Sequence, residues 1–181
     1  LRTKPGVYVR RRGNEELEAA FNLSKGANFK VMMEPEKGLL YMQPGHTTAR
    51  VALYPVLRAL DVPHQDIAKS WGAQVASINR DAFRSPDAHI GRLYESLIHP
   101  AKRNHATPEA RAGAIREYLD ATSMDPEVNR ATLGAPFDKA SGQAILAASN
   151  KILEVHRRAA DVDDRDSLAF KTFHSVDDFV R

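Results

Sequence analysis

Three cap-and-proline motifs in the middle of the chain constrain its fold more than any other feature. Ser85-Pro86, Thr107-Pro108 and Asp125-Pro126 each place a side chain that accepts hydrogen bonds from backbone N–H groups directly before a proline. Such side chains are favoured N-caps, and proline suits the first helical position because its fixed φ matches the helix. Apolar residues follow the first motif at helical spacing, at Ile90, Leu93, Tyr94, Leu97 and Ile98. The motifs therefore predict three successive helices.

Further elements are predicted on either side of these three helices. We expect short helices at 55–60, 64–71 and 73–83, a longer one at 141–156, and a last one from near Ser175. Two apolar runs, FKVMM at 29–33 and LLYM at 39–42, flank the polar turn EPEKG and predict a hairpin. The expected fold is mainly α with a small antiparallel β hairpin near the N-terminal side, an α+β fold. Residues 1–72 would hold the hairpin and short helices, and residues 73–181 the helical part, an Asp-rich loop and the final helix.

Composition narrows the chemistry that is open to this chain. It has 181 residues, a formal net charge of +3 and no cysteine, so a disulfide framework, a zinc–thiolate centre and a thiol nucleophile are excluded. No stretch approaches the ~20 apolar residues that a membrane span requires, so we expect no membrane partner. The chain begins with Leu1 and stops at Arg181 inside an apolar–polar pattern, so we expect a piece of a longer protein.

Positive charge gathers at the start of the chain. Arg2, Lys4, Arg10, Arg11 and Arg12 all precede the first acidic residue, Glu15. A run of this kind is typical of a solvated loop or strand edge, and it can also contact phosphate groups. The sequence alone leaves both interpretations open.

Asp163, Asp164 and Asp166 form the one dense acidic cluster of the sequence. Because Mg²⁺ prefers oxygen ligands, a small metal-dependent phosphodiesterase or nuclease could be built on it. However, consecutive aspartates project in different directions, and no second acidic motif completes such a site. The alternative is a structural loop in which these aspartates accept hydrogen bonds from backbone N–H groups and pair with arginines. A third interpretation is a helical domain whose faces bind another protein.

Two segments resemble the β, or second-largest, subunit of multisubunit DNA-directed RNA polymerases. Residues 144–181 are similar to the segment of that subunit in which a helix with a basic end leads into an Asp-Asp-x-Asp loop. Asp163, Asp164, Asp166 and Leu168 fall on this motif and Lys171 on a basic position, whereas Phe170 and Thr172 depart from the family pattern. Residues 33–71, with VLRALD at 56–61, resemble the lobe region. The chain would be a divergent member, such as a phage-encoded one.

The resemblance implies a polymerase β-lobe-like fold and a non-catalytic role in a nucleotidyltransferase. The lobe forms one wall of the cleft that receives downstream DNA, so DNA and the other polymerase subunits, especially the largest, are the expected partners. The family holds its catalytic Mg²⁺ on the largest subunit, so no cofactor is expected in this segment. The implied location is the bacterial cytoplasm or an infected cell. The cluster around Asp163 would then be an architectural loop.

Four cations near this cluster are the candidate contacts to nucleic acid. Arg157 and Arg158 end the predicted helix at 141–156, and Arg165 and Lys171 lie in the expected loop. A polymerase wall needs contacts to the phosphate backbone and no base-reading side chains, because it must accept every sequence. The alternative for the first pair is compensation of the helix dipole, and for the second pair it is pairing with neighbouring aspartates.

Overall fold

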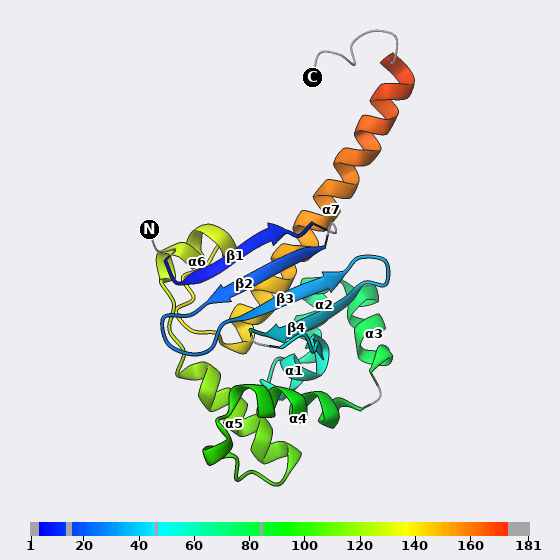
Figure 1. The fold of residues 1–181 in the computed structure, drawn as a ribbon. Helices are drawn as coiled ribbons and strands as arrows, with labels where there is room; N and C mark the ends of the chain where they lie inside the picture. The colour runs from blue at the N-terminus through cyan, green and yellow to red at the C-terminus, as the bar shows by residue number, and fades with distance from the viewer. Residues whose placement is uncertain (1–3, 14–15, 46, 84, 174–181) are drawn as a thin grey trace.

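A five-stranded antiparallel sheet occupies the first third of the chain (Figure 1). The computed structural model describes residues 4–13, 16–45, 47–83 and 85–173, with side chains up to residue 159. The strands, in an order that follows the sequence, are β1 (Gly6–Arg11), β2 (Leu17–Asn22), β3 (Phe29–Glu34), β4 (Leu39–Pro44) and β5 (Val51–Ala52). The α+β class and the predicted hairpin, which is β3–β4, are confirmed. The β part is larger than expected, because β1 and β2 extend the hairpin into a sheet.

The two faces of the sheet differ in chemistry. Along β2 and β3 the buried apolar side chains Ala19, Phe21, Phe29 and Val31 recur at every second residue, as the pleat of a strand requires. The residues between them include Glu18 and Lys30, so charged groups lie on the opposite face. The rings of Phe21 and Phe29 are cross-strand partners and stack with their centroids 4.4 Å apart. The register therefore gives the sheet one apolar face and a second face, the polar face, which carries these charged groups beside the buried side chains of Ala20 and Met32.

The helices follow the strands closely in sequence. They are α1 (Leu53–Ala59), α2 (His64–Trp71), α3 (Ala73–Ala82), α4 (Pro86–Leu97), α5 (Pro108–Asp120), α6 (Pro126–Leu133) and α7 (Gly142–Phe173), with a 3-10 turn at Pro100–Lys102. The three cap-and-proline motifs do begin helices. Thr107 accepts from the Ala110 N–H and Asp125 from the Glu127 N–H, whereas Ser85 forms no such cap bond.

Helix α7 covers the apolar face of the sheet (Figure 1). It contacts β1, β2 and β3 on one side and α2 on another, and then projects beyond the sheet. Ile145 and Ile152 of α7 are fully buried, as is Trp71 at the end of α2. One apolar core includes residues from both 1–72 and 73–181. Both parts of the chain therefore share a single interior.

The expected Asp-rich loop is not a loop in the structure. Helix α7 continues through Asp163, Asp164 and Asp166 to Phe173. The physical reason is that no proline or glycine follows Gly142 within this stretch, so no residue interrupts the backbone hydrogen bonds of the helix. The prediction that a structural turn separates residues 141–156 from the C-terminal segment was therefore wrong. The final helix predicted from near Ser175 lies outside the described residues.

Two buried asparagines tie helices to the edges of the sheet. Asn129 of α6 accepts a hydrogen bond of 2.8 Å from the Val7 N–H of β1, and its amide donates to the Phe137 carbonyl at 2.6 Å. Asn79 of α3 accepts from the Leu40 N–H of β4 at 2.9 Å. Both asparagines are fully buried. Each therefore satisfies a backbone donor that the sheet itself leaves without a partner.

Candidate nucleic-acid interface

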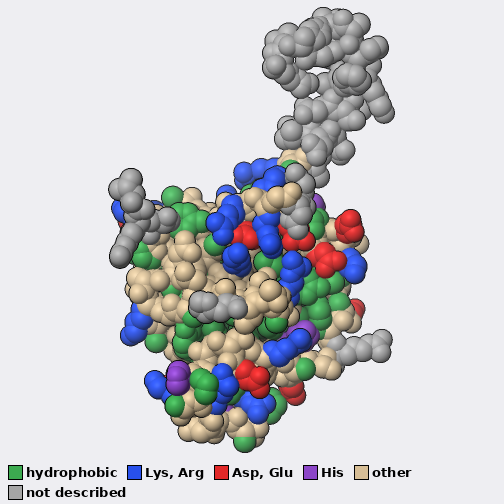
Figure 2. Space-filling view, in the orientation of Figure 1, with side chains coloured by type: hydrophobic (Ala, Val, Ile, Leu, Met, Phe, Trp, Pro, Cys, Tyr) green, Lys and Arg blue, Asp and Glu red, His purple; other side chains and the backbone are tan. Residues whose placement is uncertain are grey.

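The polar face of the sheet carries a cluster of cations around two glutamates. Figure 1 shows no helix over this face, and Figure 2 shows Lys and Arg side chains gathered there with Asp and Glu side chains. The cations come from three separate parts of the sheet. We call the set the basic cluster, and its members are Arg10, Arg12, Lys30, Arg50, Glu16 and Glu18.

Glu18 lies at the centre of the basic cluster and is 1% exposed. Arg10, its cross-strand partner, places Nε 2.6 Å from one carboxylate oxygen. Arg12 Nε lies 3.4 Å from the other oxygen, and Lys30 Nζ lies 3.8 Å from the oxygen that Arg10 contacts. The three cations are themselves between 37% and 59% exposed. The carboxylate is therefore covered by basic groups that still face solvent.

Arg50 and Tyr41 extend the basic cluster toward β4. Arg50 lies 3.3 Å from a Glu16 oxygen, and its guanidinium is 5.7 Å from the centroid of the Tyr41 ring. Burial raises the pKa of the Tyr41 hydroxyl, and the Glu34 charge raises it further. The hydroxyl therefore stays protonated and donates to Glu34 at 3.5 Å. An aromatic ring that stacks under a guanidinium fixes the position of that cation.

The charges of the basic cluster do not cancel. Four cations face two carboxylates, so the group carries a formal surplus of two positive charges. Phosphate groups bind to such surfaces because the cations displace the counterions that surround a nucleic acid. Guanidinium groups add paired N–H donors that match the oxygens of a phosphate. The basic cluster can therefore hold a phosphate backbone without reading bases.

The four cations predicted from the sequence lie elsewhere, on α7. Arg157 donates a hydrogen bond of 2.6 Å to the carbonyl of Trp71, so its guanidinium closes the end of α2. Arg158 lies 3.8 Å from Glu154 one helical turn earlier; its own side chain is largely exposed and that of Glu154 is about half exposed. Arg165 and Lys171 belong to the helical part of α7 whose side chains are not described. The structure thus gives Arg157 an internal partner and leaves Arg158 at the surface.

Sequence inspection found part of the basic cluster and missed the rest. Arg10 and Arg12 belong to the basic run that was noted at the start of the chain. Lys30, Arg50 and the two glutamates were not connected to it, because only the strand register brings them together. The available signal was the alternation of charge at Arg10, Arg12, Glu16 and Glu18, which is typical of a strand pair with one polar face.

Among the described side chains, no group of three His, Asp or Glu residues could hold a metal ion. This statement does not extend to Asp163, Asp164 and Asp166, whose side chains are not described. None of the helices that the structure describes is long and apolar enough to cross a membrane.

The chain is compared with protein-family models and with curated proteins. No protein-family model matches the chain, and no curated protein matches it. The basic cluster and the residues around it are therefore the observations from which a function is proposed.

Proposed function

We propose that this chain is a lobe-like module of a DNA-directed RNA polymerase β subunit, which forms part of the wall of the DNA cleft. It contacts the nucleic-acid backbone without sequence preference. The single observation that carries this proposal is the basic cluster on a sheet face that no described helix covers. The resemblance of residues 33–71 and 144–181 to the β subunit supplies the polymerase context.

The arrangement around Glu18 suits sequence-independent binding. A buried carboxylate holds Arg10, Arg12 and Lys30 close together before any ligand arrives, which lowers the entropy cost of ordering them on binding. Because these cations remain partly exposed, a phosphate can approach them without displacing the protein core. Backbone contacts position a duplex but carry no base information. A wall of this kind would hold any DNA sequence with equal strength.

The module contributes no catalytic residue in this proposal. The partners are DNA and the other polymerase subunits, especially the largest, which would hold the catalytic Mg²⁺. The bacterial cytoplasm or an infected cell is the corresponding location. A net charge of +3 is small, so we expect the chain alone to bind DNA weakly and the assembled enzyme to bind it strongly.

The proposal is tested by removing two outer cations of the basic cluster. In Lys30→Gln with Arg50→Gln, we expect weaker binding of a short random-sequence duplex and a salt dependence that is shallower by about 1.8 in log–log slope, since each lost phosphate contact contributes about 0.9. The matched control is Lys102→Gln with Arg80→Gln, which removes the same charge from exposed positions outside the basic cluster. An unchanged slope in the first pair, or an equal loss in the control, would contradict the proposal.

A second experiment tests the cations on the projecting part of α7. Charge reversal at Arg165 and Lys171 together should weaken the retention of downstream DNA by the assembled polymerase and flatten its salt dependence. If the double variant keeps the parental slope, these two residues do not contact DNA. The basic cluster is left intact in this variant, so the two surfaces are tested independently.

A further inference from the structure

Strand β1 forms one edge of the sheet, and among the described residues those at the start of α6 cover the first half of this edge. The Pro5 carbonyl accepts from the Asp125 N–H at 3.0 Å, and the Val7 N–H donates to the Asn129 side chain at 2.8 Å. Both partners belong to the start and first turns of α6. Natural sheets cover or charge their edges because unpaired N–H and C=O groups invite another strand.

Beyond Val7 the edge opens to solvent. The Arg12 N–H donates to the Glu16 carbonyl at 2.7 Å, and Arg12 and Glu16 continue the β1–β2 register. In an antiparallel pair of strands, residues whose N–H and C=O groups bond to the partner strand alternate with residues whose N–H and C=O groups point away from it. Arg10 therefore pairs with β2, whereas the N–H and C=O of Val9 point away from it, as those of Val7 do. No described residue supplies a hydrogen bond to these two groups of Val9.

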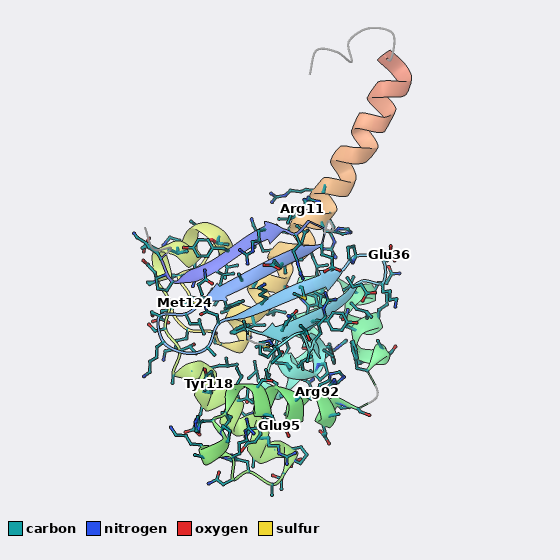
Figure 3. The ribbon with its side chains drawn as sticks, viewed as in Figure 1. Arg11, Glu36, Arg92, Glu95, Tyr118 and Met124 are labelled. Atoms are coloured by element: carbon teal, nitrogen blue, oxygen red, sulfur yellow. The ribbon has the colours of Figure 1, made fainter. Side chains whose placement is uncertain are left out.

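A groove lies directly beside this open part of the edge. Its volume is about 420 Å³, and α6 contributes Ala131 and Thr132 to its wall while α7 contributes Lys151 and Val155. The remaining lining residues are Tyr8, Val9, Arg10, Arg11 and Leu17. Figure 3 shows Arg11 at the end of β1, beside the point where α7 leaves the sheet. The groove thus combines an apolar lining with basic groups at a strand edge.

We propose that an acidic, extended segment of a partner polypeptide adds to β1 in this groove as a further strand of the sheet. Its main chain would pair with the N–H and C=O of Val9. Alternate side chains of an added strand point to opposite faces, so its apolar residues would contact Val9 and Val155. Its carboxylates, on the opposite face, would meet Arg10, while Lys151 lies one helical turn from Val155 and adds positive charge to the same groove.

Charge complementarity identifies the occupant as acidic. Arg10, Arg11 and Lys151 all line the groove, and none of its described lining residues is acidic. Lys151 has no ion pair with any described side chain, so its ammonium group is available to a partner. A peptide fits better than a nucleic acid, because the outward groups of Val9 offer one donor and one acceptor while Leu17 and Val155 offer apolar contact. A phosphate backbone uses neither of these features.

The proposal goes beyond the DNA contact of the basic cluster. The two surfaces share Arg10 but are otherwise built from different residues. Lys151 and Val155 belong to the groove and are not part of the basic cluster. Variants of Lys151 therefore test peptide binding and leave the cations around Glu16 and Glu18 in place.

The test uses a short peptide of alternating Glu and Val, added to the full chain while amide hydrogen exchange is followed by NMR. We expect saturable binding and an exchange rate of the Val9 amide that falls about tenfold or more, because the amide becomes hydrogen-bonded. The same peptide with proline at alternate positions should not protect Val9, since proline cannot complete the ladder. Absence of saturable binding, or binding without protection of Val9, would overturn the proposal.

Variants locate the site on the chain. Lys151→Glu should weaken the peptide about tenfold or more, which corresponds to about 1.4 kcal/mol. The control Lys69→Glu carries the same charge change on an exposed position of α2 and should keep the parental affinity. Equal weakening by both variants would show a nonspecific charge effect and overturn the proposal. Protection of Val9 by a short DNA duplex, and not by the peptide, would assign the groove to nucleic acid instead.

Discussion

The indole N–H of Trp71 donates a hydrogen bond of 2.7 Å to the hydroxyl of Ser149, and both side chains are fully buried where α2 packs against α7. The same hydroxyl donates to the Leu146 carbonyl at 2.6 Å. A large aromatic side chain can fill the core at this place because a small polar residue on the facing helix accepts the hydrogen bond of its N–H group.

Ser149→Ala is therefore expected to destabilise the protein by about 1–3 kcal/mol, because the indole N–H is left buried without an acceptor. The measurement is urea unfolding followed by far-UV circular dichroism. The control is the same substitution in a Trp71→Phe background, where no indole N–H remains and the cost should shrink. Equal costs in both backgrounds would show that the hydrogen bond contributes nothing.

Asn129→Ala should cost about 2–4 kcal/mol, since it removes the acceptor of the buried Val7 N–H and the donor to the Phe137 carbonyl. Hydrogen exchange at Val7 should accelerate more than exchange at Leu40, which is held by Asn79 at the other side of the sheet. Asn79→Ala serves as the mirror control, with Leu40 affected and Val7 spared. If either variant accelerated hydrogen exchange equally at Val7 and Leu40, the two asparagines would not act locally on their own strands.

Glu18→Gln should lower the free energy of unfolding by about 2 kcal/mol at low salt, because Arg10, Arg12 and Lys30 then repel one another without a carboxylate between them. Added salt screens this repulsion, so the loss should diminish as ionic strength rises. The comparison is Glu154→Gln, which removes a charge from the exposed pair with Arg158 and should cost little at any salt concentration. A salt-independent loss for Glu18→Gln would refute the electrostatic explanation.

His89 should make stability depend on pH. Its Nδ1 accepts hydrogen bonds from the Ala52 N–H at 3.2 Å and from Arg92 at 2.9 Å, so Nδ1 carries no proton in the native state. Burial lowers the pKa of His89 below its ordinary value of 6.5, and the Arg92 charge lowers it further. The unfolded chain therefore binds the proton first as pH falls, so this stabilisation is present above 6.5 and is lost as pH falls through the native pKa.

The variant His89→Asn isolates this contribution, because an amide oxygen can accept a hydrogen bond but does not titrate. Its unfolding free energy should change less than that of the parent between about pH 7.5 and pH 5.5. The other histidines titrate equally in both proteins, so only the difference between the two curves is assigned to His89. If the unfolding free energies of parent and variant changed equally with pH, the prediction would be wrong.

Arg157→Ala should destabilise the protein by about 1 kcal/mol, because the Trp71 carbonyl at the end of α2 loses its donor. Arg158→Ala should change stability by less than about 0.5 kcal/mol, since its pair with Glu154 is exposed. Thermal unfolding of the two variants gives the comparison. Equal effects on stability would mean that the contact with Trp71 is not a structural one.

Much of the helical part of the fold could be predicted from the sequence. The cap-and-proline motifs locate the starts of α4, α5 and α6, since these signals are local. Strands β1 and β2 were missed because β1 carries basic residues on its open face and β2 contains Ala19 and Ala20, which have little β preference. The Asp-rich turn was wrong because aspartates alone do not end a helix that lacks proline and glycine.

The candidate site was less predictable than the helices. Glu16 and Arg50 are 34 residues apart in sequence, and only the complete sheet places them 3.3 Å apart. The groove beside Val9 depends in the same way on α6 and α7, which come more than a hundred residues later. A local pattern gives no information on such distant neighbours, whereas strand register gives it directly.

The placement of α7 over the sheet has a consequence for synthesis of the chain. The ribosome releases β1 to β4 first, and their apolar face meets its covering helix only after residue 142 has emerged. At about 5–20 residues per second, this face stays unprotected for several seconds or longer. The nascent chain is therefore most vulnerable to aggregation just before α7 docks, and chaperone capture during this interval would raise the yield of folded protein.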